Sequence, residues 1–162
     1  MVSRSTNRRV WASSAVAALL LGYLVSGAAP ASARPFDCKQ DFVTSSVTGH
    51  TQNRTKLPLT RTGIEKGITN SWGDEPATAL KPHELDVWCV YAQGFGAAMK
   101  VNYALPDGTT AFYEAWRYQF GSGARCDVLG PSAADYRCHA RGWAHPEGGR
   151  DADARFDLIP VR

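Results

Sequence analysis

Apolar and polar residues alternate with a period of two through most of the second half of the chain. From Met99 to Leu105 every second residue is a large apolar one, and Pro106-Asp107-Gly108 follows. Proline presets the backbone for a turn, and Asp-Gly supplies the positive φ that hairpin turns require. With Asp107 and Gly108 as a two-residue loop, Met99 would face Trp116. The pattern therefore predicts a β-hairpin over residues 99–120, with Trp116 on its apolar face.

Other segments carry the strand pattern too. Residues 87–91 form a β-branched and aromatic run that is typical of a strand buried on both faces. Residues 151–158 alternate between charged residues and Ala, Phe or Leu, as in a half-buried strand, and 42–47 and 54–59 are further candidates. Short strands separated by turn residues predict an all-β fold: a single, two-sheet antiparallel β-sandwich over residues 34–162.

The first 33 residues have the order of a secretory signal peptide. A basic start with Arg4, Arg8 and Arg9 precedes an apolar run over 10–25, and Ala31-Ser32-Ala33 is an A-x-A cleavage pattern. The alternative, a retained membrane anchor, needs about 20 apolar residues, which is more than this run supplies. We therefore expect a secreted, extracellular protein that is exported by the general or the twin-arginine route.

N-terminal sequencing of the secreted protein is expected to begin at Arg34, because a signal peptidase cleaves after the A-x-A pattern. Intact mass measured on the same sample should correspond to a chain without its first 33 residues. A product that begins at Met1, or a protein retained in the membrane, would contradict this predicted processing.

Charge outside the signal is balanced. The chain has 18 Lys and Arg residues and 15 Asp and Glu residues, and three of the basic ones lie within 1–33. Residues 34–162 therefore have no net formal charge and contain no run of basic residues, so no nucleic-acid partner is expected. They also lack the polybasic attraction that draws proteins to anionic lipids. A neutral membrane or the surface of an extracellular protein remains as a partner.

All four cysteines lie after the signal, and an even number in an exported chain predicts two disulfides. Of the three connectivities we expect Cys126–Cys138, which closes a short hairpin-like loop, and Cys38–Cys89, which ties the N-terminus to the sheet. No metal site is expected, because the chain has no C-x-x-C pair and its histidines keep no ligand spacing with the cysteines. Residues 94–96 begin like a dinucleotide loop but lead into a strand, so no cofactor is expected.

A tryptophan in a polar segment is the main binding candidate. Trp72 lies within residues 69–76, with Asp74 and Glu75 close by and almost nothing apolar beside it. An exposed loop tryptophan often marks binding to a protein, a carbohydrate or a bilayer interface. We therefore predict a binding loop that contains Trp72, Asp74 and Glu75. The alternative is that Trp72 covers the end of the sandwich as a lid.

Two other patterns were weighed for chemistry. Glu114, Arg117, His139 and His145 are residue types that carry out acid–base and phosphate-binding work in a small hydrolase when a fold brings them together. Asn53-Arg54-Thr55 matches the N-glycosylation sequon by pattern only. The four candidate residues do not have the spacing of a catalytic motif. We therefore expect a non-enzymatic protein with no catalytic residues.

A set of turn and packing residues spreads over the middle of the chain. Its members are Gly67, Trp72, Pro76, Leu80-Lys81-Pro82, Gly94-Phe95-Gly96, Val101-Asn102-Tyr103, Leu105-Pro106-Asp107-Gly108-Thr109, Phe112, Trp116, and Gly121-Ser122-Gly123 before Cys126. In this set the chain resembles small β-sandwich proteins of the aegerolysin family, including their bacterial insecticidal crystal-protein relatives. The resemblance implies a sandwich fold and a lipid-binding, membrane-active, toxin-like protein, often with a second, pore-forming partner.

The chain departs from that family in its signal peptide and its two cysteine pairs, and no lipid-binding residues match one by one. Turn and packing residues are better evidence for fold than for activity. We expect a secreted, non-enzymatic binding protein that interacts with lipid or a membrane. One alternative is a secreted protein inhibitor or other protein-binding module that presents residues 71–76. A small secreted hydrolase is the other.

Overall fold

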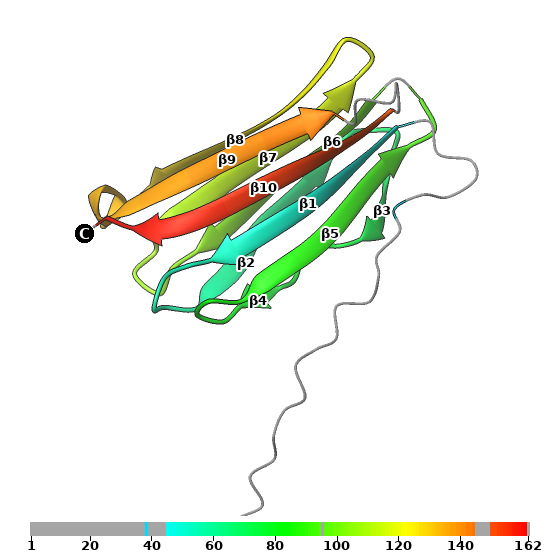
Figure 1. The fold of residues 1–162 in the computed structure, drawn as a ribbon. Helices are drawn as coiled ribbons and strands as arrows, with labels where there is room; N and C mark the ends of the chain where they lie inside the picture. Colours follow the sequence, from blue (N-terminus) through cyan, green and yellow to red (C-terminus); the bar gives the residue numbers. More distant parts are fainter. Residues whose placement is uncertain (1–37, 39–44, 95, 145–149, 162) are drawn as a thin grey trace, which may run out of the picture. The chain divides into compact units, whose positions relative to one another are not determined.

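The computed structural model of the protein describes residues 38, 45–94, 96–144 and 150–161. These residues form two five-stranded sheets packed face to face (Figure 1). The first sheet has the order β3-β5-β1-β10-β9 and the second has the order β4-β2-β6-β7-β8. The predicted all-β, two-sheet sandwich is therefore confirmed. The predicted signal peptide lies outside the described residues.

The strand bounds follow the turn residues of the sequence. In the first sheet they are β1 Ser45–Asn53, β3 Asn70–Asp74, β5 Leu85–Ala92, β9 Tyr136–Ala144 and β10 Asp151–Pro160. In the second sheet they are β2 Leu59–Lys66, β4 Ala79–Leu80, β6 Gly96–Ala104, β7 Thr110–Tyr118 and β8 Gly121–Leu129. One 3-10 turn, η1 Ala133–Asp135, lies between β8 and β9.

One strand pair departs from the predicted antiparallel arrangement. β1 and β10 are parallel, with Val47 opposite Ala152 and Thr51 opposite Phe156. All other pairs among the described strands are antiparallel. Alternation in a sequence identifies which residues face the core but contains no information about strand direction. The direction is decided when β10, returning from β9, inserts beside the first strand.

The predicted register of the β6–β7 hairpin is wrong by one residue. The loop contains three residues, because the Leu105 amide donates to the Thr109 carbonyl at 2.8 Å and Gly108 adopts φ 87°. This is the geometry of a turn followed by a glycine bulge. Consequently Ala115 faces the core, and Trp116 lies half-buried on the outer face of its sheet. Truncating Trp116 is therefore not a core deletion.

The core between the sheets is aromatic at its centre. Trp88 stacks on Phe156 with ring centroids 6.2 Å apart, and Tyr113 lies 5.0 Å from Phe156. Tyr103 contacts Tyr113 at 6.1 Å and donates its hydroxyl hydrogen to the Ala77 carbonyl. Burial raises the pKa of both tyrosine hydroxyls, so both stay neutral in the folded protein.

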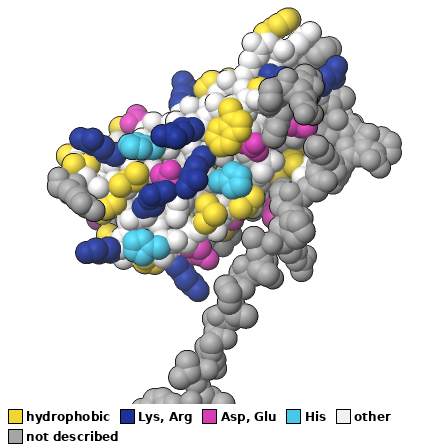
Figure 2. Space-filling model, in the orientation of Figure 1, with side chains coloured by type: hydrophobic (Ala, Val, Ile, Leu, Met, Phe, Trp, Pro, Cys, Tyr) yellow, Lys and Arg dark blue, Asp and Glu magenta, His cyan; other side chains and the backbone are white. Residues whose placement is uncertain are grey.

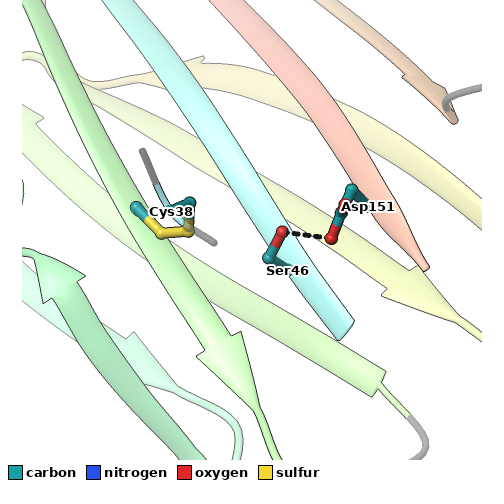
Figure 3. Close-up of a disulfide and its surroundings, with 4 residues drawn as sticks. Cys38, Ser46 and Asp151 are labelled. Carbon is teal, nitrogen blue, oxygen red and sulfur yellow. Dashed lines mark hydrogen bonds between the residues drawn. A yellow bond between two sulfur atoms is a disulfide. The ribbon is translucent and has the colours of Figure 1, made fainter. Parts of the chain in front are cut away.

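Both predicted disulfides are confirmed. Cys126–Cys138 joins β8 to β9, at the edge where the two sheets approach each other. Cys38–Cys89 joins Cys38 to the outer side of β5, and Figure 3 shows this disulfide near the hydrogen bond of 2.6 Å from Ser46 to Asp151. Two disulfides in a domain of this size are typical of proteins that work in an oxidising, extracellular environment.

Candidate functional site

The predicted binding loop around Trp72 is instead an edge strand. Trp72 pairs with Val90 across β3 and β5 and is half-buried against the core, which agrees with the lid alternative. Asp74 is exposed at the end of β3, and Glu75 forms an ion pair of 2.6 Å with Arg61. The prediction of a loop over residues 69–76 is wrong because an edge strand that buries only one of its faces needs few apolar residues. Binding by Trp72, Asp74 and Glu75 stays a prediction.

The residues considered for a hydrolase are not assembled. Glu114 lies on the outer face of the second sheet, where it pairs with Arg125 at 2.5 Å. His139 lies on the outer face of the first sheet, so the sandwich core separates the two side chains. Arg117 is near the end of β7, where it donates to the Tyr118 carbonyl. His145 lies outside the described residues. The structure therefore does not bring Glu114 and His139 together as the hydrolase alternative would need.

One end of the sandwich presents large apolar side chains to solvent. The connections β2–β3, β5–β6 and β7–β8 all lie at this end, because the strands that they join end or begin there (Figure 1). Ile68 in the first of these connections is fully exposed, and Phe120 in the last is 94% exposed. Tyr118, at the end of β7, is 52% exposed. We call Ile68, Tyr118 and Phe120 the apolar tip.

A tight turn holds Ile68 outward. The Asn70 amide donates to the Gly67 carbonyl at 2.9 Å, and the Gly67 amide donates to the Ala98 carbonyl at 3.0 Å. The buried Asn70 side chain occupies the space over Gly67, where an added Cβ would lie 1.8 Å from its Oδ1 atom. Lys66 also donates to the Asn70 carbonyl. These contacts fill the inner side of the turn and leave Ile68 on the outer side.

The same asparagine connects the two halves of the tip. Asn70 Nδ2 donates to the Gly96 carbonyl at 3.0 Å, and Gly96 is the strand partner of Tyr118. Tyr118 in turn pairs with Gly121, so only two residues form the turn that carries Phe120. The Asn70 amide thus braces the turn that carries Ile68 against the start of β6, and β6 pairs with the strand that leads to the Phe120 turn. Figure 2 shows hydrophobic side chains at the extremity of this end.

A hollow of about 260 Å³ lies beside the tip, on the outer side of β2, β6 and β7. Gly67 and Tyr118 are among its lining residues, so it lies between the two turns. The charged residues around it are Glu65, Lys66, Lys100 and Glu114. The end of the molecule thus combines exposed apolar side chains with a balanced polar border.

Sequence reasoning missed Ile68 and Phe120. Phe120 was counted as the last residue of a strand, and Ile68 was not singled out. The signal that identifies them is a large apolar residue at a position where turn residues are expected, next to Gly67 in one case and Gly121 in the other. Only the fold shows that the two turns lie at the same end.

No family model matches the sequence, and no curated protein matches it. Solved structures do match by fold. The crystal structure of the lipid binding protein Nakanori superposes with a TM-score of 0.62 at 13% identity, over 72% of each chain. The wild-type lectin XCL of Xerocomus chrysenteron gives a TM-score of 0.47 at 8% identity, over 70% of this chain and 98% of that chain.

At 13% identity, the similarity to Nakanori shows the fold alone. It agrees with the sandwich that the aegerolysin resemblance implies, while membership of that family stays a prediction. In the part of the chain that the structure describes, no helix is long and apolar enough to cross a membrane. Within the same residues, no group of three or more His, Cys, Asp or Glu side chains is placed to hold a metal ion.

Proposed function

We propose that this protein is a non-enzymatic binding protein that attaches to the surface of a neutral lipid membrane through its apolar tip. The observation that carries the proposal is the almost complete exposure of Ile68 and Phe120 on two short turns at one end. Isolated exposed apolar residues are normal on protein surfaces, but clustered ones mark interaction sites. Tyr118 adds an amphipathic ring of the kind that suits the level of lipid headgroups.

Energy and charge both fit a reversible membrane attachment. Moving a Phe or Ile side chain out of water contributes about 1.5–3 kcal/mol when burial is complete. Two such side chains give a weak anchor of the kind that holds interfacial proteins reversibly. The balanced charge of residues 34–162 favours a neutral surface over an anionic one. The fold shared with a lipid binding protein supports a lipid partner.

Sedimentation with neutral phosphatidylcholine vesicles tests the proposal. The double variant Ile68→Asp/Phe120→Asp should bind at least about tenfold more weakly, since each tenfold corresponds to about 1.4 kcal/mol. The control is Leu129→Asp, which places an acid at a leucine that is 55% exposed and lies at the opposite end of β8. The control should bind like the wild type, and all three proteins should melt at similar temperatures because the changed side chains are exposed.

Equal binding by the wild type and the double variant would contradict the proposal. If Trp72→Ala or Glu75→Ala instead abolished capture of an extracellular protein, while vesicle binding was absent, the protein-binding alternative would take its place.

A further inference from the structure

A second surface lies on the outer face of the first sheet. It is lined mainly by charged side chains, whereas the apolar tip is not. A groove of about 340 Å³ lies there over β9, β10 and the residue that follows β1. Its lining residues are Arg54, His139, Arg141, Arg155, Asp157 and Ile159, and we call it the arginine groove. Figure 2 shows Lys, Arg and His side chains gathered over this face, with Asp and Glu between them.

The groove holds more positive charge than its own carboxylate neutralises. Asp157 accepts from Arg54 Nε at 2.9 Å and lies 3.4 Å from Arg155 Nε, so two guanidinium groups share one carboxylate. Arg141 lies directly opposite Arg155 in the β9–β10 pairing. Among the residues that the structure describes, Arg141 has no ion-pair partner. Like charges placed directly opposite each other destabilise a sheet, so the arrangement calls for an external anion.

The arginines are partly pre-oriented for such an anion. Arg54 is held by its backbone amide, which donates to the Leu158 carbonyl at 3.0 Å, and by its Nε bond to Asp157. Arg155 is held on its other side by a bond of 3.1 Å from Nη2 to Gln52. A guanidinium group anchored in this way presents a planar fork that matches the oxygen atoms of phosphate or sulfate. His139 adds a further ring donor at the groove wall.

We propose that the arginine groove binds a tetrahedral oxyanion, a phosphate or sulfate group carried on a soluble ligand. Arg141 would supply the uncompensated charge, while Arg54 and Arg155 would supply donors oriented by Asp157. The groove lies toward the ends of β1 and β10, whereas the apolar tip lies where these strands begin. A protein attached to a membrane by its tip therefore holds the groove away from that membrane, which favours a soluble ligand over a headgroup.

Titration with inorganic phosphate and inorganic sulfate, at ionic strength held constant with sodium chloride, tests the site. The readouts are calorimetry and the NMR signals of the His139 ring. Saturable binding is expected in the wild type, with affinity reduced about fivefold or more in Arg141→Ala, because a charge-assisted hydrogen-bond donor is lost. Arg141→Ala should fold normally, since it removes no ion pair with a described residue and relieves the repulsion with Arg155.

The matched control is Arg137→Ala, which removes the same charge from the same face of β9 but lies outside the groove. It should bind phosphate within about twofold of the wild type, since exposed charges that make no direct contact are screened by salt. Equal weakening by both variants would show diffuse electrostatics and overturn the proposal, as would the absence of saturation in the wild type.

Vesicles that contain phosphatidic acid identify the source of the oxyanion. If the wild type and Arg141→Ala bind them equally, the ligand is soluble; Arg141-dependent vesicle binding would overturn that choice in favour of a headgroup. The proposal for the arginine groove and the proposal for the apolar tip can be contradicted independently of each other. Arg141→Ala should bind phosphatidylcholine vesicles normally, and Ile68→Asp/Phe120→Asp should bind phosphate normally.

Discussion

Replacing Gly49 with alanine is expected to destabilise the protein by about 3 kcal/mol, at the upper end of the usual cost of overpacking. An added Cβ would lie 1.8 Å from the Trp88 ring, which crosses over Gly49 as its strand partner. The ring cannot move aside easily. It stacks on Phe156 on one side, and its Nε1 atom donates to Thr51 Oγ1 at 2.9 Å.

Urea unfolding of the oxidised protein measures the change. Gly121→Ala is the matched control, because nothing lies within 4 Å of its added Cβ, and a shift within about 0.5 kcal/mol is expected there. A double-mutant cycle sharpens the test. In a Trp88→Leu background the clash is relieved, so Gly49→Ala should cost much less than it does in the wild type. If its cost is the same in both backgrounds, the Trp88 ring is not the cause.

Asn53→Asp is expected to destabilise the protein by about 3 kcal/mol or more, although the two side chains have the same shape. Asn53 is fully buried, and its Nδ2 atom faces the carbonyl oxygens of Leu57, Leu80 and Lys81 at 2.8, 3.3 and 3.0 Å. Its Oδ1 atom accepts from the Thr55 amide and hydroxyl. Ionised aspartate would place a charged acceptor against these carbonyl oxygens. Protonated aspartate would offer them one O–H donor in place of the two N–H donors of the amide.

Asn102→Asp is the control for the chemical change itself. Asn102 is half-buried on the outer face of β6, and no described carbonyl accepts from its side-chain amide, so a change within about 0.5 kcal/mol is expected. Thermal and urea unfolding of both variants make the comparison. Similar stability of the two variants would show that the buried amide contributes little.

The same geometry changes the interpretation of the sequon over residues 53–55. In the folded protein the Asn53 amide is enclosed and fully hydrogen-bonded, so it is not accessible as a glycosylation acceptor. The Asn and Thr of the pattern are needed for the turn that leads from β1 to β2. The Asn-x-Thr pattern thus has a structural role, which became visible only from the hydrogen bonds of its side chains.

The local features of this protein were determined by the sequence itself. Alternation over 151–158 identified a strand and its buried side, and β10 buries Ala152, Ala154, Phe156 and Leu158 as that pattern requires. The short spacing of Cys126 and Cys138, 12 residues apart, favoured the disulfide that joins them. These features are predictable because a strand has a fixed period of two, and because a disulfide joins residues that the turns already bring close.

Relations between strands were decided only by the tertiary structure. The hydrogen bonds of a three-residue loop moved Trp116 to the outer face, and insertion of β10 beside β1 made that pair parallel. Pairing of β9 with β10 placed Arg141 opposite Arg155. The β2–β3 and β7–β8 connections, which carry Ile68 and Phe120, lie at the same end of the sandwich because β2 and β7 both end there. Each of these pairings depends on packing between segments far apart in the chain, which local periodicity does not record.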